Sequence, residues 1–152
     1  MGTHYRGTAQ EQLALEVFIK LTRAAESVGQ RINGHLSAVN LTVSQFGVLE
    51  ALFHLGPMHQ KDLGEKILKS SGNMTLVIDN LGKRGLVQRE RDPRDRRCYL
   101  VTLTPAGEAL ISDLFPRHVA IVTREIGALN PAEQEQLATL CRKLGLGAPA
   151  AQ

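Results

Sequence analysis

Apolar residues recur at steps of three or four over the first quarter of the chain, the spacing of one face of an α-helix. The pattern predicts a helix over residues 9–38. Phe18, Ile19 and Ala25 widen the stripe, so we expect this helix to pack against more than one neighbour. The stripe itself consists of Leu13, Val17, Leu21, Ala24, Val28, Ile32 and Leu36.

A second helix is expected directly afterwards. Thr42 and Gln45 have the spacing of a capping box, in which each side chain bonds to the backbone of the other residue. The helix should end at Gly56 and Pro57, which interrupt the pattern. A short third helix is expected over residues 59–68.

A fourth helix is predicted over residues 72–84, between small capping residues and Gly85. Its spacing separates an apolar face from a polar one. The inward positions are Met74, Val77, Ile78 and Leu81, and the outward ones include Asn73, Thr75, Leu76, Asp79, Asn80 and Lys83.

After this helix, apolar and polar residues alternate with a period of two, which is typical of a β-strand. Residues 86–89 and 98–103 read as two strands, and Asp92-Pro93 marks a turn in the arginine-rich loop between them. The strands predict a β-hairpin. Five arginines lie among residues 89–97, so the hairpin is either a solvated turn or a finger that contacts a negatively charged partner.

Two more helices complete the pattern. Thr104-Pro105 begins a long one, which Pro116 is expected to kink or interrupt. Asn130 and Glu133 mark the start of the last, whose apolar positions are Leu137, Leu140 and Leu144. The fold class is therefore mainly α with a small β-hairpin wing, a winged helix-turn-helix with further helices at both ends.

Charge adds to this picture. The chain of 152 residues has a formal net charge of +3. Residues 59–97 hold ten Lys or Arg and six Asp or Glu, which gives +4, whereas the other residues hold eight and nine, which gives −1. Positive charge gathered in one segment is typical of a surface that binds phosphates.

Other functions find little support in the sequence. Neither a signal peptide nor an apolar run of membrane-spanning length is present, so we expect a cytoplasmic protein without membrane contact. Neither a glycine-rich phosphate loop nor a nucleophile elbow is present, so we expect neither an enzyme nor a cofactor. No metal-ligand spacing is formed by Cys98 and Cys141, or by the histidines at 35, 54, 59 and 118.

The wing carries the most specific motif. Asp95-Arg-Arg97 is followed by Leu100-Val-Thr-Leu-Thr104 and then by Pro-Ala-Gly107. With residues 70–87 and 42–52, this resembles the MarR family of bacterial transcriptional regulators, over nearly the whole chain. The opening Tyr-Arg-Gly-Thr and the Ser-Ser-Gly-Asn-Met-Thr of residues 70–75 look closest to a subgroup that senses phenols and quinones.

Membership of this family would imply a homodimer that binds a pseudo-palindromic DNA operator, usually as a repressor. A small, often aromatic or phenolic ligand would weaken the binding. Residues 1–40 and 105–152 would be the dimerisation helices of one intertwined unit, and residues 41–104 the DNA-binding domain. Two alternatives remain: a winged-helix module that contacts protein, and a repressor that senses oxidants through cysteine.

The predicted recognition helix would lie in the major groove, where base edges present donors and acceptors. The polar side chains there are suited to base edges, and Leu76 to a thymine methyl group. The lysines would bind phosphates, and so would the residues that begin the third helix. The predicted DNA contacts of these helices are Gln60, Lys61, Lys69, Ser71, Asn73, Thr75, Leu76, Asn80 and Lys83, with Arg84 as a further phosphate contact.

In the wing, we expect Arg94, Arg96 and Arg97 to reach the minor groove, with Arg97 inserted and Asp95 orienting it. Asp79 is expected to form an internal salt bridge instead of reading a base.

Candidates for a ligand pocket are His35, Phe46 and Phe53, which could line a cleft between the dimerisation helices and the DNA-binding domain. The alternative for each is an ordinary core or surface residue.

Overall fold

The fold was obtained as a computed structural model that describes residues 2–67 and 71–148, without the side chains of residues 71 and 72. It is mainly helical with one small sheet, as the sequence predicts. The elements are α1 (Ala9–Asn33), a 3₁₀ helix (Gly34–Val39), α2 (Val43–Leu55), β1 (Met58–His59), α3 (Gln60–Ile67), α4 (Ser71–Lys83), β2 (Val87–Asp92), β3 (Asp95–Leu103), α5 (Pro105–Ile126) and α6 (Pro131–Gly145).

The chain forms two compact units. One combines the N-terminal segment up to Ile32 with the segment from Val119 onward, and the other is Asn33–His118. We call the second the reading unit because it contains the predicted recognition helix and wing. The predicted functional division at residues 41 and 104 remains a proposal.

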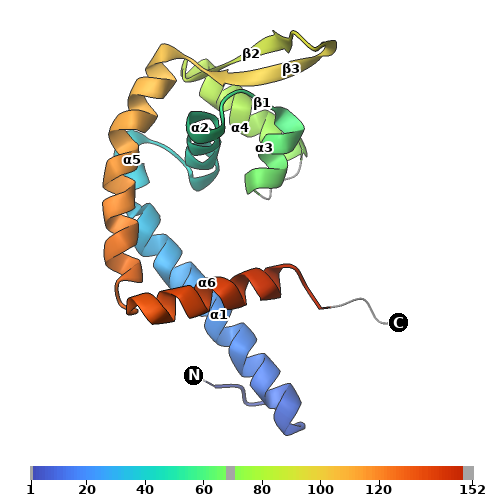
Figure 1. Ribbon diagram of the computed structural model, residues 1–152, viewed down its shortest axis with the longest axis vertical. Helices are drawn as coiled ribbons and strands as arrows, with labels where there is room; N and C mark the ends of the chain where they lie inside the picture. The colour runs from blue at the N-terminus through green and yellow to red at the C-terminus, as the bar shows by residue number, and fades with distance from the viewer. Residues whose placement is uncertain (1, 68–70, 149–152) are drawn as a thin grey trace. The chain divides into compact units, whose positions relative to one another are not determined.

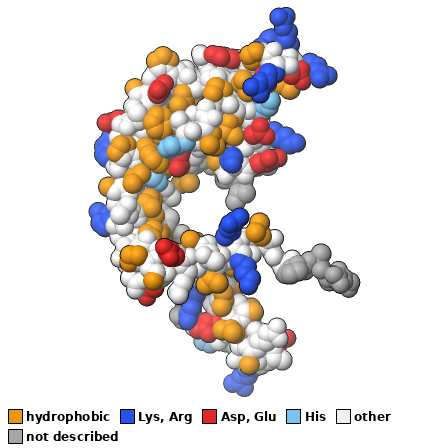
Figure 2. All heavy atoms as spheres, viewed as in Figure 1, with side chains coloured by type: hydrophobic (Ala, Val, Ile, Leu, Met, Phe, Trp, Pro, Cys, Tyr) orange, Lys and Arg blue, Asp and Glu red, His pale blue; other side chains and the backbone are white. Residues whose placement is uncertain are grey.

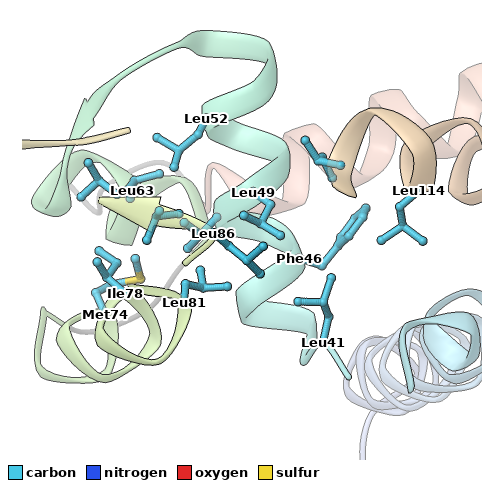
Figure 3. Packing of buried hydrophobic residues seen from close by; sticks show 14 of the residues in the cluster. Leu41, Phe46, Leu49, Leu52, Leu63, Met74, Ile78, Leu81, Leu86 and Leu114 are labelled. Carbon is cyan, nitrogen blue, oxygen red and sulfur yellow. The ribbon is translucent and has the colours of Figure 1, made fainter. Parts of the chain in front are cut away.

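The core of the reading unit lies between α2, α3, α4 and the sheet (Figure 3). Burial of one aliphatic side chain of this size stabilises the fold by about 1.5–3 kcal/mol, so this cluster holds the short helices in place. Its fully buried members include Leu49, Leu63, Met74, Ile78 and Leu81, and α5 contributes Ile111 and Leu114.

The sheet is antiparallel with the strand order β1-β3-β2, and β2 and β3 extend from the helices as a hairpin (Figure 1). The two-residue strand β1 was not predicted from the sequence. The hairpin strands are also longer than predicted: β2 continues to Asp92 and β3 begins at Asp95. The expected arginine-rich loop is therefore wrong, because most of its arginines lie on paired strands and the turn is only Pro93 and Arg94.

Both predicted capping boxes are present. The Thr42 hydroxyl accepts a hydrogen bond from the Gln45 backbone N–H, and the Gln45 side-chain oxygen accepts one from the Thr42 backbone N–H. Asn130 and Glu133 form the same pair of bonds. These reciprocal bonds satisfy backbone donors that the first turn of a helix leaves unpaired, and so fix where α2 and α6 begin.

One predicted helix limit is wrong. The first helix ends at Asn33 instead of residue 38, and a 3₁₀ turn follows that closes at Asn40 in the left-handed conformation. Of the two outcomes expected at Pro116, a kink or an interruption, the interruption does not occur, since α5 is continuous from Pro105 to Ile126. The cost of the missing N–H at Pro116 is limited to one backbone bond, and the apolar face of α5 offsets it.

The other unit holds α1, the end of α5 and α6. Arg31 on α1 bonds to Glu125 on α5 at 2.7 Å. No residue of α1 or α6 is buried in the chain, although both helices carry large apolar side chains. None of the described helices is by itself long and apolar enough to cross a membrane, and α1 and α2 satisfy that test only as a consecutive pair.

Candidate nucleic-acid interface

Helix α4 presents a polar face away from the core. Asn73, Thr75 and Leu76 are exposed, while Asn80 is half-buried and Lys83 lies exposed in the last turn. The buried residues of the same helix fix this orientation, because they occupy the opposite face at helical spacing. This is the geometry that the sequence predicts for a helix whose outer face reads DNA.

The start of α4 is only partly described. Ser71 is its first residue, but the position of its side chain is not described, and Lys69 lies outside the described residues. The DNA contacts predicted for these two residues therefore stay predictions from the sequence.

The structure brings Gln60 and Thr75 together. The Gln60 amide donates to the Thr75 hydroxyl at 2.7 Å, which joins the start of α3 to the exposed face of α4. Lys61, beside Gln60, is exposed. Two side chains that were each predicted to contact DNA are thus hydrogen-bonded to one another in the absence of DNA.

Arg89 on β2 connects the wing to both helices, and sequence reasoning missed it. Its guanidinium donates to Asp79 on α4 at 2.8 Å and to the Gln60 side chain at 3.4 Å. The predicted internal salt bridge of Asp79 is therefore confirmed. A signal was present in the sequence, since Arg89 lies two residues after Val87 and therefore on the same face of the strand as this buried residue, but it did not reveal the partner.

Arg84 has a structural role in the described fold. It donates to the backbone carbonyls of Asn40 at 2.6 Å and Val39 at 3.1 Å. These carbonyls end the 3₁₀ helix and need a donor. These bonds use two of the five guanidinium donors of Arg84, so its predicted phosphate contact stays a prediction, as does that of Lys83.

The wing gathers positive charge at its free end. Figure 2 shows Lys and Arg side chains clustered there, and the arginines of that end are Arg91, Arg94, Arg96 and Arg97, all exposed. Arg91 donates to the Arg96 carbonyl at 2.7 Å, and its guanidinium lies 5.3 Å from the centre of the Tyr99 ring. These contacts stiffen the hairpin on one face.

Asp95 orients Arg97, as predicted. Two carboxylate oxygens of Asp95 accept from Nε and Nη2 of Arg97 at 3.1 and 3.2 Å. The bond from Arg97 holds the pKa of Asp95 below its usual value, and the same bond raises the pKa of Arg97. The Arg97 side chain is 90% exposed, so it is held in direction and still accessible to a partner.

A mostly helical reading unit with an exposed polar helix and an arginine-rich hairpin is the architecture of a winged-helix DNA-binding protein. The MarR family profile matches residues 41–99, which include α2 to α4 and most of the wing. The regulator MhqR of Bacillus subtilis is 36% identical over 135 residues, which cover 89% of this chain and 93% of MhqR.

The chain belongs to the MarR family. The repressor NicR of Pseudomonas putida is 35% identical over 68% of this chain and 66% of its own. The solved structure of BpsR from Bordetella bronchiseptica, whose DNA binding is regulated by 6-hydroxynicotinic acid, has a TM-score of 0.79 at 32% identity and covers 95% of this chain and all of BpsR. The prediction of a DNA-binding transcriptional regulator of the MarR type is confirmed.

In this MarR-family regulator, the three predicted pocket residues do not meet in one place. His35 and Phe46 do, with ring centres 6.3 Å apart, and both pack against His118. Phe53 instead contacts His54 and lines a separate hollow with Leu52, Pro57, Thr102, Leu103 and Glu108. A series of ring contacts connects the two places: Phe53 contacts His54, His54 contacts Phe115, and Phe115 contacts His118.

His118 is a member of the ring cluster that was not predicted. His35 Nε2 and His118 Nδ1 lie 3.0 Å apart, a hydrogen bond in which one imidazole donates to the other. Burial lowers the pKa of both histidines, and the charges of His118 and Arg117 lower the pKa of His35 further. The pair is therefore neutral near pH 7, and one imidazole N–H donates to the unprotonated nitrogen of the other.

Cys98 of the MarR-family wing has an unreactive environment. It lies half-buried on β3, and its thiol donates to Asp95 Oδ2 at 3.7 Å. Burial, followed by the neighbouring Asp95 charge, raises the pKa of the thiol. A reactive cysteine needs a lowered pKa, so this geometry does not favour oxidant sensing at Cys98. Cys141 is exposed on α6. Across the described residues, no group of three or more His, Cys, Asp or Glu is arranged to hold a metal ion.

Proposed function

We propose that this protein is a cytoplasmic, homodimeric repressor that binds a pseudo-palindromic DNA site through α4 and the wing. The observation that carries the proposal is the physical link between the two. Arg89 joins the wing strand to the outer face of α4 and to the start of α3, so the two proposed DNA-contacting surfaces are physically linked. A major-groove helix and a minor-groove finger need such a frame to bind one duplex together.

The DNA contacts would divide by chemistry. Asn73, Thr75 and Asn80 would bond to base edges in the major groove, and Leu76 would contact a thymine methyl group. Lys61 and Lys83 would bind phosphates and set the position of the protein on the duplex. The exposed arginine Arg97, held by Asp95, would enter the minor groove, flanked by Arg94 and Arg96.

A dimer is supported by apolar surface that the single chain leaves uncovered. On α1, Leu13 and Phe18 are 62% and 61% exposed, and on α6, Leu140 is 61% exposed. Apolar surface of this extent on the terminal helices is typical of a protein interface. Two protomers would place their recognition helices in successive major grooves, about 34–36 Å apart, which is why the site should be pseudo-palindromic.

A small aromatic ligand is proposed to weaken the DNA complex. BpsR is regulated by 6-hydroxynicotinic acid, and this chain shares 32% identity with it over 95% of its length. Beside the buried Phe46, the half-buried His35 and His118 supply imidazole nitrogens, which suit a flat ring that carries a hydroxyl or carboxylate group.

The proposal can be tested by measuring binding to DNA from upstream of the protein's own gene over a salt series. Arg97→Ala should weaken binding and reduce the salt slope by about one for each protomer. Arg117→Ala, which removes one exposed arginine from α5, is the matched control and should leave the slope unchanged. Equal slopes for the two variants would contradict the wing contact, and light scattering that finds a stable monomer would contradict the dimer.

A further inference from the structure

Asp92 is the one charged side chain that is buried among the described residues. It lies at the end of β2, next to the wing turn, and its exposed fraction is 6%. A buried carboxylate is costly unless its oxygens accept hydrogen bonds. The partners of Asp92 therefore show what this position requires.

Both carboxylate oxygens of Asp92 are occupied. Oδ1 accepts from the Arg94 backbone N–H at 2.8 Å, and Oδ2 lies 2.7 Å from His59 Nε2. The hydrogen bond from the Arg94 backbone N–H is the main reason that the pKa of Asp92 lies below its usual value, and the bond from the His59 ring is the second. The carboxylate is therefore ionised near pH 7. An ionised carboxylate only accepts, so His59 Nε2 carries the proton and donates it.

His59 reaches the wing from the helix-turn-helix. It is the second residue of β1, pairs with Leu100 of the central strand β3, and immediately precedes Gln60, the first residue of α3. Its other nitrogen, Nδ1, lies 3.9 Å from Asp62 in the first turn of α3. The imidazole thus stands between the start of α3 and the turn of the wing.

The strand register places Asp92 and its bonds directly at the turn of the hairpin. The β2–β3 pairing is irregular between Arg91 and Asp92, and Asp92 then pairs directly with Asp95. Only Pro93 and Arg94 remain between them, and the amide of Arg94 is fixed by the same carboxylate that His59 holds. A shift of the Asp92 side chain would therefore shift the backbone of Arg94. It would also shift Asp95, which pairs with Asp92 and binds the Arg97 side chain.

We propose that His59 is a positioning residue of the DNA interface, which fixes the wing turn relative to α3 through Asp92. It needs no contact with DNA to do so. The role rests on the proposed minor-groove contact of the wing. It differs from the link made by Arg89, which joins the middle of the wing strand to α4, because His59 fixes the free end of the hairpin.

The first test needs no DNA. The exchange rate of the Arg94 amide hydrogen, followed by NMR in the full-length protein, reports whether the Asp92 carboxylate stays in place. His59→Ala and Asp92→Asn should raise this rate roughly tenfold, because the charge-assisted bond that holds the carboxylate is lost or weakened. His59→Gln, whose amide can donate to the same oxygen, should restore a rate close to wild type.

Asp113→Asn is the matched control, since Asp113 forms an exposed ion pair with Arg117 on α5 and lies outside the wing. It should leave the Arg94 amide unchanged. An Arg94 exchange rate that is the same in His59→Ala and wild type overturns the proposal. If His59→Ala does not fold, His59→Gln and Asp92→Asn still decide it, because one should keep the slow exchange and the other should lose it.

The second test measures DNA affinity in wild type, His59→Ala, Arg97→Ala and the double variant. His59→Ala should weaken binding roughly tenfold alone and much less when Arg97 is already removed, since the two act through the same contact. Additive losses, or no loss in His59→Ala, overturn the positioning role. If Arg97→Ala has no effect while His59→Ala speeds Arg94 exchange, the wing contact itself is wrong and the hold of His59 on the turn stands.

Discussion

Arg89 on the wing strand β2 and Asp79 on α4 lie 2.8 Å apart and join the two proposed DNA-contacting surfaces of one protomer. Both side chains are more than a third exposed, so solvent screening keeps the contribution of this pair to stability small, at about 0–1 kcal/mol. Its importance should therefore appear in DNA binding more than in folding.

Arg89→Ala should lower DNA affinity by roughly tenfold while changing the free energy of unfolding by less than about 1 kcal/mol. The reason is that α4 and the wing lose their common hold and must be ordered on binding. Urea unfolding and a DNA titration on the same preparations measure the two effects. Glu90→Ala, on the neighbouring exposed strand position, serves as the control, and a stability loss without an affinity loss in Arg89→Ala would contradict this account.

Gly107 should not tolerate a side chain. A Cβ at this position in the first turn of α5 would overlap the backbone carbonyl oxygen of Leu86. Gly107→Ala should therefore destabilise the protein by about 1–3 kcal/mol, as forced overpacking does. Gly82→Ala is the matched helix substitution, because its Cβ meets nothing closer than 3.9 Å and should stabilise α4 by about 0.5–1 kcal/mol. Thermal unfolding of both variants checks the opposite signs.

The His35–His118 pair should make the reading unit sensitive to mild acid. Burial lowers the pKa of both rings in the folded protein, so the unfolded chain binds protons first as the pH falls. The stability they contribute is complete above the ordinary histidine pKa of about 6.5 and is lost as the pH falls through the lower folded pKa. Arg117 opposes protonation of His35, and Glu50 favours that of His118, but burial is the larger effect on each.

Chemical unfolding at pH 7.5, 6.0 and 5.0 tests this. The wild type should lose stability over this range, and His118→Gln should lose less, because one of the two buried imidazoles is absent. His4→Gln, which replaces an exposed histidine, should follow the wild type. Parallel curves for wild type and His118→Gln would show that the pair does not control the acid response.

Cys98 should react slowly with alkylating agents. Burial and the Asp95 charge raise the pKa of its thiol, so little thiolate is present near neutral pH. Mass spectrometry after iodoacetamide treatment at pH 7.5 should find Cys98 modified more slowly in the folded protein than in urea. Faster modification in the folded state would restore the oxidant-sensing alternative.

Patterns with a local cause were predictable from the sequence. The capping boxes at Thr42 and Asn130 depend on residues three positions apart, and the recognition helix depends on an apolar face of regular spacing. The length of the wing strands was not predictable, because alternating arginines and acids carry no hydrophobic period, and the pairing that holds them comes from the partner strand. Arg84, Arg89 and His59 are positioned by partners that lie 44, 10 and 33 residues away in the chain, respectively. No spacing rule reveals such partners.

The Asp95–Arg97 contact has a consequence for conformational entropy. An exposed arginine normally samples many rotamers, and immobilising one costs about 0.5–1.5 kcal/mol on association. Two of the five N–H donors of Arg97 are already directed at Asp95, while the side chain remains 90% exposed. Part of the ordering is thus complete in the free protein, and the remaining donors face a partner from a defined direction.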